Sequence, residues 1–369
     1  MRELLSKAKF NWQKRYIYLF KRDTAPYPQS INIEITWNCN LNCIMCPRIR
    51  GQPFKLKNKN MSFLEFKKIL EEVPSCKHIN IIGAGEPLTH PEFLEMLQYA
   101  DSKGITVSFT TNGTLLNREK IIKLPKNITS VWFSIDSPVP EIYESIRVGS
   151  NFFTVLHNME TLRKLRRNTK IYIQTLLMRR NYKDLHNLIS IAKKVNAVIS
   201  FIHPIAFDNE EDKQHVHYLG EEYGKYSQKV YEEAKKQRIK VFYRPACPTQ
   251  KPYACTEPWF TPTISIIGDV YPCCYIYEAR GGALSFKEYY LGEYISVPMY
   301  QYRMGNVFEN SLIDIWNREE FKLLRRKVIE THQPSSISLQ ELKNLRRSVN
   351  LNDRYSYCKV CLWRWMCAC

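Results

Sequence analysis

Three cysteines crowd one short loop of this 369-residue chain. Cys39, Cys43 and Cys46 lie so close together that disulfide bonds among them could not constrain a long loop, so their spacing favours metal binding. Three thiolates can hold three corners of an iron–sulfur cube and leave the fourth iron without a protein ligand. An open metal position is a place for reaction chemistry, whereas a fully ligated one is structural. The alternative interpretations are a zinc ion with a distant fourth ligand and cysteines that are simply buried.

Most of the remaining cysteines lie near the carboxyl end of the chain. The sequence has twelve in total, and none occurs between Cys76 and Cys247. Cys76 is isolated, and we expect it to be buried and inert. The later group comprises Cys247, Cys255, Cys273, Cys274, Cys358, Cys361, Cys367 and Cys369. Because this region is rich in proline and poor in periodic apolar residues, it is typical of a small domain stabilised by metal. We expect a hairpin over 263–273 and a helix over 311–327.

Strand and helix patterns alternate regularly through the middle of the chain. The predicted strands are 31–36, 78–82, 105–110, 130–135, 170–177 and 198–202. The predicted helices between them are 63–73, 93–102, 115–123, 154–166 and 182–195. This alternation predicts a parallel α/β sheet with right-handed crossovers, either open or curled into a barrel. In both cases the loops at the carboxyl ends of the strands meet at one edge, where ligands bind.

Polar turns follow the second, third and fourth predicted strands. The first is Gly83-Ala84-Gly85-Glu86-Pro87, in which two glycines allow a ligand to approach the backbone and Glu86 can accept from a ligand ammonium group. It is not a dinucleotide fingerprint, since Leu88 stands where a glycine is required. The others are residues 110–113 and 134–137. We therefore expect these three turns and the cysteine loop to meet at the same end of the parallel strands.

The cysteine triplet and these turns, in this order, resemble the radical S-adenosylmethionine (radical SAM) superfamily over about residues 30 to 235. The resemblance implies a [4Fe–4S] cluster on Cys39, Cys43 and Cys46 whose open iron chelates S-adenosylmethionine. It also implies that residues Gly83, Ala84, Gly85 and Glu86 contact the methionine amino group. Ser134 and Arg147 correspond to positions that bind ribose or carboxylate. Met45 stands where the family usually has an aromatic residue against the adenine, a role that a thioether can fill.

The implied reaction is reductive cleavage of S-adenosylmethionine to a 5′-deoxyadenosyl radical, which then abstracts hydrogen from a substrate carbon. The implied fold is a partial (β/α)6 TIM-like barrel followed by a small irregular α+β domain. We therefore expect three parts: a basic amino-terminal extension over 1–28, the barrel over 29–240 and an auxiliary cluster domain over 241–369.

The carboxyl-terminal cysteines, together with residues 304–307 and 311–317, resemble the SPASM extension found on part of this superfamily. The resemblance implies one or two auxiliary [4Fe–4S] clusters. One cluster can use Cys255, Cys273, Cys358 and Cys361. In the alternative, Cys247, Cys255, Cys273 and Cys369 hold one cluster, and Cys358, Cys361 and Cys367 hold a second.

The charge balance indicates an anionic partner. Lys and Arg number 54 against 36 Asp and Glu, a formal net charge of +18. A small anionic substrate resembling a sugar, a nucleotide-sugar or a lipid headgroup fits this surplus. A peptide or protein side chain is the alternative substrate, and a non-catalytic metal scaffold is the remote one. We expect a reductant such as flavodoxin or ferredoxin and, without a recognisable module, no nucleic acid.

The ends of the sequence and its minor polar residues give weaker signals. The basic segment before residue 23 is interpreted as a lid on the domain, with peripheral attachment to an anionic membrane as the alternative. No apolar run is long enough for a transmembrane segment, and a secretory signal is absent, so we expect a cytoplasmic protein. The basic run 163–170 is interpreted as the solvated end of a helix. Minor candidates for the site are Asp136, Tyr172, Gln174, His203, His215 and His217.

Overall fold

The computed structural model describes residues 16–46, 48, 59–202, 221–242, 254–274, 276, 285–290, 293–298, 302–332, 339–350, 353, 355–359 and 361. Several predicted site residues lie outside this part of the chain. They are Cys247, Cys367 and Cys369, together with His203, His215 and His217. In the described part no helix has the length and apolar character needed to cross a membrane.

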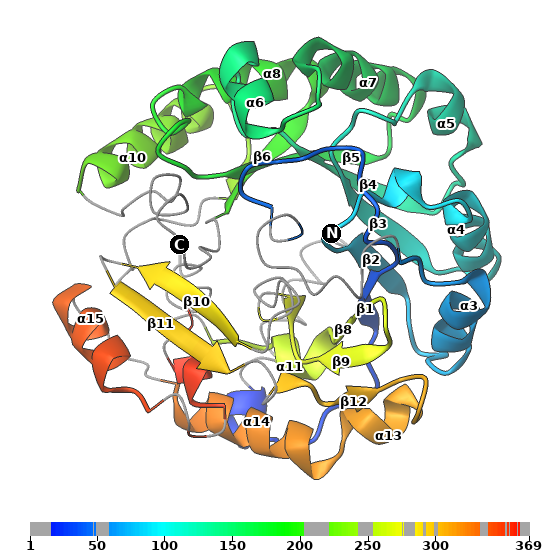
Figure 1. Cartoon of the computed structure of the whole chain (residues 1–369), viewed down its shortest axis with the longest axis vertical. Helices are drawn as coiled ribbons and strands as arrows, with labels where there is room; N and C mark the ends of the chain where they lie inside the picture. Colours follow the sequence, from blue (N-terminus) through cyan, green and yellow to red (C-terminus); the bar gives the residue numbers. More distant parts are fainter. Residues whose placement is uncertain are drawn as a thin grey trace.

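Seven parallel strands form the main body of the molecule. They are β1 (Ser30–Glu34), β2 (His78–Ile82), β3 (Thr106–Thr111), β4 (Ile128–Ser134), β5 (Lys170–Leu176), β6 (Ala197–Ile202) and β7 (Val241–Phe242), in that order across the sheet. The helices α3 (Phe63–Glu71), α4 (Phe93–Ser102), α5 (Arg118–Lys123), α6 (Pro140–Ile146), α7 (Phe152–Leu165), α8 (Leu188–Val195) and α10 (Glu221–Lys236) cover the outside of the curved sheet (Figure 1). The predicted parallel barrel is therefore confirmed.

The structure differs from the predicted elements at helix ends. The helix α6 was not predicted; it starts with Pro140 in its first turn, where the missing amide hydrogen costs no hydrogen bond. The predicted helix over 311–327 is two helices, α13 (Leu312–Trp316) and α14 (Glu319–Glu330). Apolar periodicity continues across the break because Trp316 and Phe321 are both buried in the same core.

The carboxyl-terminal region continues the same sheet. Strand β8 (Thr263–Ile264) pairs in parallel with β1, and β9 (Asp269–Tyr271) and β12 (Gly305–Asn306) extend the sheet beyond it. The predicted hairpin is thus confirmed as β8–β9, with Gly268 at a φ of +82° in its turn. Two further strands, β10 (Ser285–Tyr290) and β11 (Glu293–Pro298), form a separate antiparallel pair that lies apart from the barrel strands (Figure 1).

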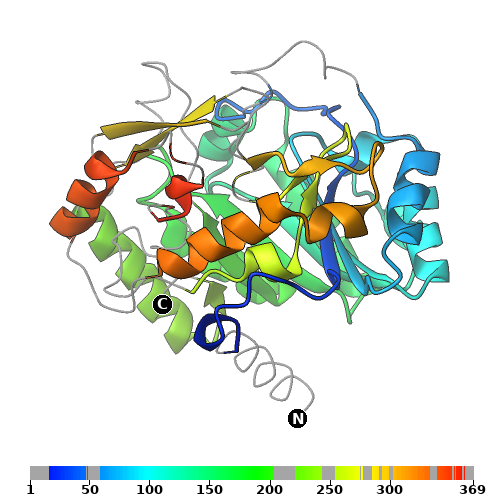
Figure 2. The ribbon, with the colours of Figure 1, turned by 90° about the horizontal axis from the view of Figure 1, so that it is seen from below.

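A fully buried arginine joins the amino-terminal segment to this region. The guanidinium group of Arg325 on α14 donates to the carbonyl oxygens of Pro258 (2.9 Å), Asp23 (3.1 Å) and Trp316 (2.8 Å). It also lies 4.7 Å from the ring centroid of Trp316. Burial lowers the pKa of Arg325 to about 9, which leaves the side chain charged at neutral pH. Figure 2 shows α14 crossing the face of the molecule near this amino-terminal segment.

We predict that Arg325→Met destabilises the protein. The substitution leaves several buried carbonyl oxygens without a donor, which costs about 3 kcal/mol. The matched control is Arg326→Gln, because Arg326 is half-buried and pairs with the carboxylates of Asp23 and Glu319 rather than with buried carbonyls. Denaturant unfolding of both variants measures the effect. Equal midpoints for the two variants would contradict the structural role of Arg325.

Candidate functional site

The cysteine loop lies directly after β1, at the carboxyl end of the parallel strands. Backbone hydrogen bonds clamp it to the turn that follows α6: the amide of Asn42 donates to the carbonyl of Val148 (2.9 Å), and the amide of Ile44 donates to that of Ile146 (3.0 Å). Within the loop the amide of Cys46 donates to the carbonyl of Cys43 (3.1 Å). The three thiols are therefore held by a backbone frame that belongs to the barrel.

The thiols of this loop are in a desolvated environment. Burial raises the pKa of Cys43 to about 12 and also raises the pKa of Cys39. At neutral pH these thiols keep their protons unless a metal replaces them, because metal binding releases protons from cysteine ligands.

Arg147 stands beside the buried thiol of Cys43. Its Nε is 2.7 Å from Oδ2 of Asp136, whose side chain is fully buried, and its Nη1 lies 3.9 Å from Sγ of Cys43. Burial opposes the charge on Arg147, but Asp136 and Cys43 outweigh it, so the pKa of Arg147 lies above its usual value. Asp136 in turn accepts from the amide of Leu176 at the end of β5 (2.8 Å). Asp136, a minor candidate in the sequence, thus positions Arg147.

The glycines after β2 are required by the protein's own backbone. A Cβ at Gly85 would lie 2.3 Å from the carbonyl oxygen of Thr36 and 2.7 Å from that of Asn38. A Cβ at Gly83, whose φ is +136°, would lie 2.6 Å from Cγ of Glu34. The Cβ position of Gly83 is taken by the side chain of Glu34 in β1, and that of Gly85 by the backbone of Thr36 and Asn38. The contact of residues 83–86 with a cofactor stays a prediction for their backbone atoms.

Glu86 links the turns after β2 and β3. Its buried carboxylate accepts from the hydroxyl of Thr111 (2.7 Å), the amide of Asn112 (2.7 Å) and the amide of Leu88 (3.2 Å). Burial raises its pKa. These three donors belong to the protein and fix the direction of the carboxylate, and the acceptance of a ligand ammonium group by Glu86 stays a prediction.

Asn112 is a site residue that the sequence analysis passed over. Its Nδ2 donates to Oδ1 of Asn40 (2.9 Å) and lies 3.9 Å from Sγ of Cys39. The polar turn after the third strand was the available signal, but the sequence did not show which of its residues reaches the cysteine loop. Ser134 lies at the carboxyl end of β4 and is buried, and Met45 is half-buried within the loop. Their predicted cofactor contacts remain predictions.

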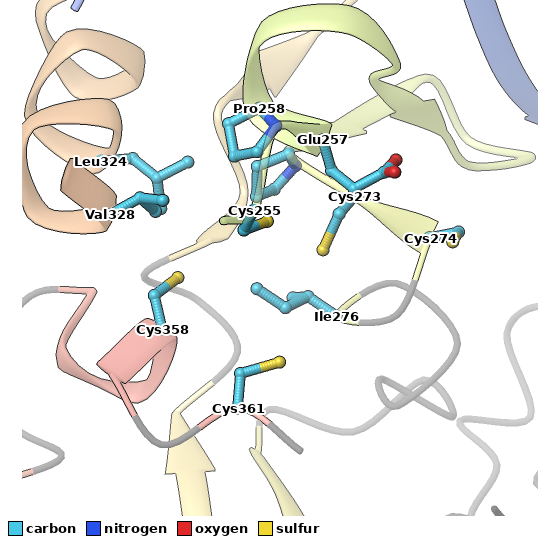
Figure 3. Close-up of a pocket in the computed structure, with 11 residues that line it drawn as sticks. Cys255, Glu257, Pro258, Cys273, Cys274, Ile276, Leu324, Val328, Cys358 and Cys361 are labelled. Atoms are coloured by element: carbon cyan, nitrogen blue, oxygen red, sulfur yellow. The ribbon is translucent and has the colours of Figure 1, made fainter. Parts of the chain in front are cut away.

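A second group of thiols lines a pocket in the carboxyl-terminal region. Cys255, Cys273, Cys358 and Cys361 come from three separate segments, and their sulfur atoms face one common space (Figure 3). Cys274 also borders the pocket, but its side chain points away from that space. The other walls are largely apolar and include Pro258, Ile276, Leu324 and Val328. Burial raises the pKa of Cys273 well above its usual value.

The donor set of this second group fits an iron–sulfur cluster better than a single zinc ion. Among the described residues, no group of three or more His, Cys, Asp or Glu side chains closes on one metal ion. Zinc requires four ligands at about 2.0–2.3 Å from one atom. A [4Fe–4S] cube places each thiolate on a different iron, so its ligands stand farther apart. The four cysteines of this pocket surround one space but do not converge on a single metal ion. This is the arrangement that a [4Fe–4S] cluster requires.

Comparison with known families decides between these interpretations. Residues 33–192 match the model of the radical SAM superfamily, and residues 255–362 match that of SPASM, an iron–sulfur cluster-binding domain. The chain is a radical SAM enzyme with a SPASM domain. Its cofactors are accordingly [4Fe–4S] clusters and S-adenosylmethionine.

Two curated relatives of this radical SAM enzyme cover most of its length. One is the tungsten-containing aldehyde ferredoxin oxidoreductase cofactor-modifying protein of Pyrococcus furiosus, 26% identical over 361 residues, which are 90% of this chain and 94% of the relative. The other is the antilisterial bacteriocin subtilosin biosynthesis protein AlbA of Bacillus subtilis, 27% identical over 307 residues. That match covers 79% of this chain and 60% of AlbA.

Two solved structures share the fold. SuiB of Streptococcus suis bound to precursor peptide SuiA superposes with a TM-score of 0.61 at 14% identity, covering 87% of this chain and 71% of SuiB. Native anSMEcpe with bound AdoMet and a Cp18Cys peptide gives a TM-score of 0.60 at 17% identity, covering 90% and 88% of the two chains. At these identities the likeness shows a shared fold.

We predict that Gly85→Ala impairs loading of the radical SAM cluster. The added methyl group pushes against the carbonyls of Thr36 and Asn38, and overpacking of this kind costs about 1–3 kcal/mol. Iron and sulfide per chain after anaerobic reconstitution should fall. Gly104→Ala is the control: Gly104 has a φ of +69°, so alanine strains the backbone there, but no neighbour lies within 4 Å of its Cβ position. It therefore measures the effect of general destabilisation without a steric clash at the site. If Gly85→Ala loads its cluster fully, cluster binding does not depend on the close approach of Gly85 to the backbone of Thr36 and Asn38.

We also predict strong coupling between Arg147 and Asp136. Arg147→Met leaves a buried carboxylate without its counter-charge, which costs about 3–5 kcal/mol. The double variant Arg147→Met/Asp136→Asn removes both charges and should lose less stability than the two single variants combined. Denaturant unfolding of the protein without clusters measures this cycle. Additive losses would mean that the ion pair contributes no specific interaction.

Proposed function

We propose that this radical SAM enzyme modifies a peptide or a protein side chain. The carrying observation is the cysteine loop, framed by the turns after β2, β3 and α6, in a chain that also gathers four cysteines in its SPASM domain. The relative AlbA is named for bacteriocin biosynthesis, and the solved structure of SuiB holds a precursor peptide. These names favour a peptide substrate over the small anionic substrate that the net charge first suggested.

In this proposal, residues around the cysteine loop hold the ligands of the reactive cluster in place and stabilise their charge. When bound, the cluster on Cys39, Cys43 and Cys46 supplies the electron that splits S-adenosylmethionine and starts hydrogen abstraction. The turn after α6 fixes the loop that carries these thiols. Arg147 places a positive charge beside Cys43, and Asn112 directs an amide group at Cys39, so both stabilise thiolate charge.

The SPASM pocket would hold an auxiliary cluster on Cys255, Cys273, Cys358 and Cys361. This set is the first of the two arrangements considered from the sequence. Tyr18 supports it from the amino-terminal segment by donating its hydroxyl to the carbonyl of Cys255 (2.8 Å). An auxiliary cluster can accept an electron from the substrate radical. We further propose an external donor of the flavodoxin or ferredoxin class, whose acidic surface would suit a chain of net charge +18.

Modification of a small anionic molecule is the second candidate function. It is favoured by the Pyrococcus furiosus relative, which is named as a cofactor-modifying protein and matches over 94% of its own length. A compact anionic substrate would also be attracted by the net charge of +18. The two candidates share the radical chemistry and differ only in the molecule that loses hydrogen.

The radical chemistry is tested by anaerobic reconstitution with S-adenosylmethionine and dithionite. We expect 5′-deoxyadenosine from the wild-type protein and none from Cys43→Ala, because the latter loses a ligand of the reactive cluster. Cys76→Ala is the matched control: this thiol is buried but stands outside both cysteine groups. Absence of 5′-deoxyadenosine from wild-type protein with intact clusters would indicate the non-catalytic scaffold.

The substrate class is tested by isotope transfer. Perdeuterated peptides encoded beside the gene and deuterated nucleotide-sugars are offered separately to the reconstituted enzyme. Deuterium in 5′-deoxyadenosine and a mass change in the peptide would support the peptide proposal. Deuterium transfer from the nucleotide-sugars alone would overturn it in favour of the small anionic substrate.

A further inference from the structure

A second cleft opens at the amino-terminal ends of the barrel strands, far from the cysteine loop. It has a volume of about 780 Å³, within the size range of small-molecule sites. Its walls are residues of β2 to β5 together with the loops that precede β4 and β5. The lining reaches Asn80, Ser108 and Tyr172, each the third residue of its strand, and Trp132 in β4, while the cysteine loop follows the carboxyl end of β1. The cleft thus opens at the opposite end of the strands from the cysteine loop.

The charged residues that line this cleft are all basic. They are Lys126, Arg166, Arg167 and Lys170. Arg166 is fixed at the rim because its guanidinium donates to the carbonyls of Leu124 (2.9 Å) and Pro125. Among the described residues, no carboxylate pairs with Lys126, Arg167 or Lys170. Four positive charges converging on one hollow without an acid attract a polyanion.

The interior of the cleft is neutral and partly aromatic. The rings of Trp132 and Tyr172 stack with centroids 3.9 Å apart and planes inclined by 5°. His78 faces Asn80 (3.1 Å) and Ser108 (3.0 Å), and burial lowers its pKa, so it is neutral at physiological pH. A planar group can rest against such a wall while its charged part reaches the basic rim.

The sheet topology argues against a peptide in this cleft. An extended peptide commonly binds by adding a strand to a free sheet edge. Here β2, β3, β4 and β5 are each paired with a neighbour on both sides, so the walls offer no free edge. A compact ligand with several phosphate oxygens matches the arginine and lysine rim and the volume of this open cleft.

We propose that this cleft binds a phosphorylated metabolite of nucleotide size, at a site separate from the radical chemistry. Binding there does not require a cluster or a peptide substrate. The proposal therefore stands or falls independently of the proposed function.

Calorimetry with the full chain tests this proposal, with ATP as the probe. Saturating S-adenosylmethionine is present throughout so that the adenosine-binding part of the radical site is filled. The double variant Arg167→Gln/Lys170→Gln should bind ATP at least about tenfold more weakly than wild type, because two charge-assisted contacts are lost. The matched control is Lys229→Gln/Lys235→Gln, which removes the same charge from exposed positions of α10.

Each outcome bears on the proposal. Weaker ATP binding in the cleft variant alone supports it, and an unchanged affinity or an equal loss in the control overturns it. Tripolyphosphate and a glutamate-rich decapeptide serve as comparison probes. If tripolyphosphate binds as tightly as ATP, the cleft recognises charge alone. If the peptide binds more tightly than ATP, the cleft is a site for an acidic peptide. Either result would overturn the proposal of a ligand of nucleotide size.

Discussion

The architecture depends on the close approach of two backbone segments at the carboxyl ends of β1 and β2. Gly85 stands so near the carbonyls of Thr36 and Asn38 that no side chain fits between them, and the amide of Glu86 donates to the carbonyl of Asn38 (2.7 Å). This contact fixes where the chain leaves β1 and hence where the three thiols lie. A glycine here serves the protein's own packing, and the cofactor then approaches a surface whose shape is already set.

Three buried acidic or basic side chains near the two cysteine groups each have a charged partner or several hydrogen bonds. Asp136 is paired with Arg147, while Glu86 accepts three hydrogen bonds and Arg325 donates to backbone carbonyls. Unpaired, such groups would each cost several kcal/mol. Because these partners come from different strands and helices, satisfying the charges also fixes the loops relative to one another.

The sequence predicted the barrel well because period and spacing are local properties. The strand β2 and the helix α4 were predicted at their observed bounds, and the cysteines of the SPASM pocket were among the sets considered. The direction of Glu86 could not be predicted, since it depends on the turn after β3 lying beside the turn after β2. The pairing of Arg147 with Asp136 depends on α6, the helix that the sequence analysis did not predict, because α6 returns the chain to the end of β4.

The continuity of the sheet explains how two domains can act as one catalytic unit. Glu34 ends β1, is fully buried, and accepts at Oε1 from the amide of Ala84 (3.1 Å) and at Oε2 from the amide of Ile266 (3.2 Å). Ala84 belongs to the turn beside the cysteine loop, and Ile266 belongs to the SPASM hairpin. One carboxylate therefore holds both parts at once, and β8 pairs with the same strand. Both contacts end on β1, so the SPASM hairpin is held against the strand that leads into the cysteine loop.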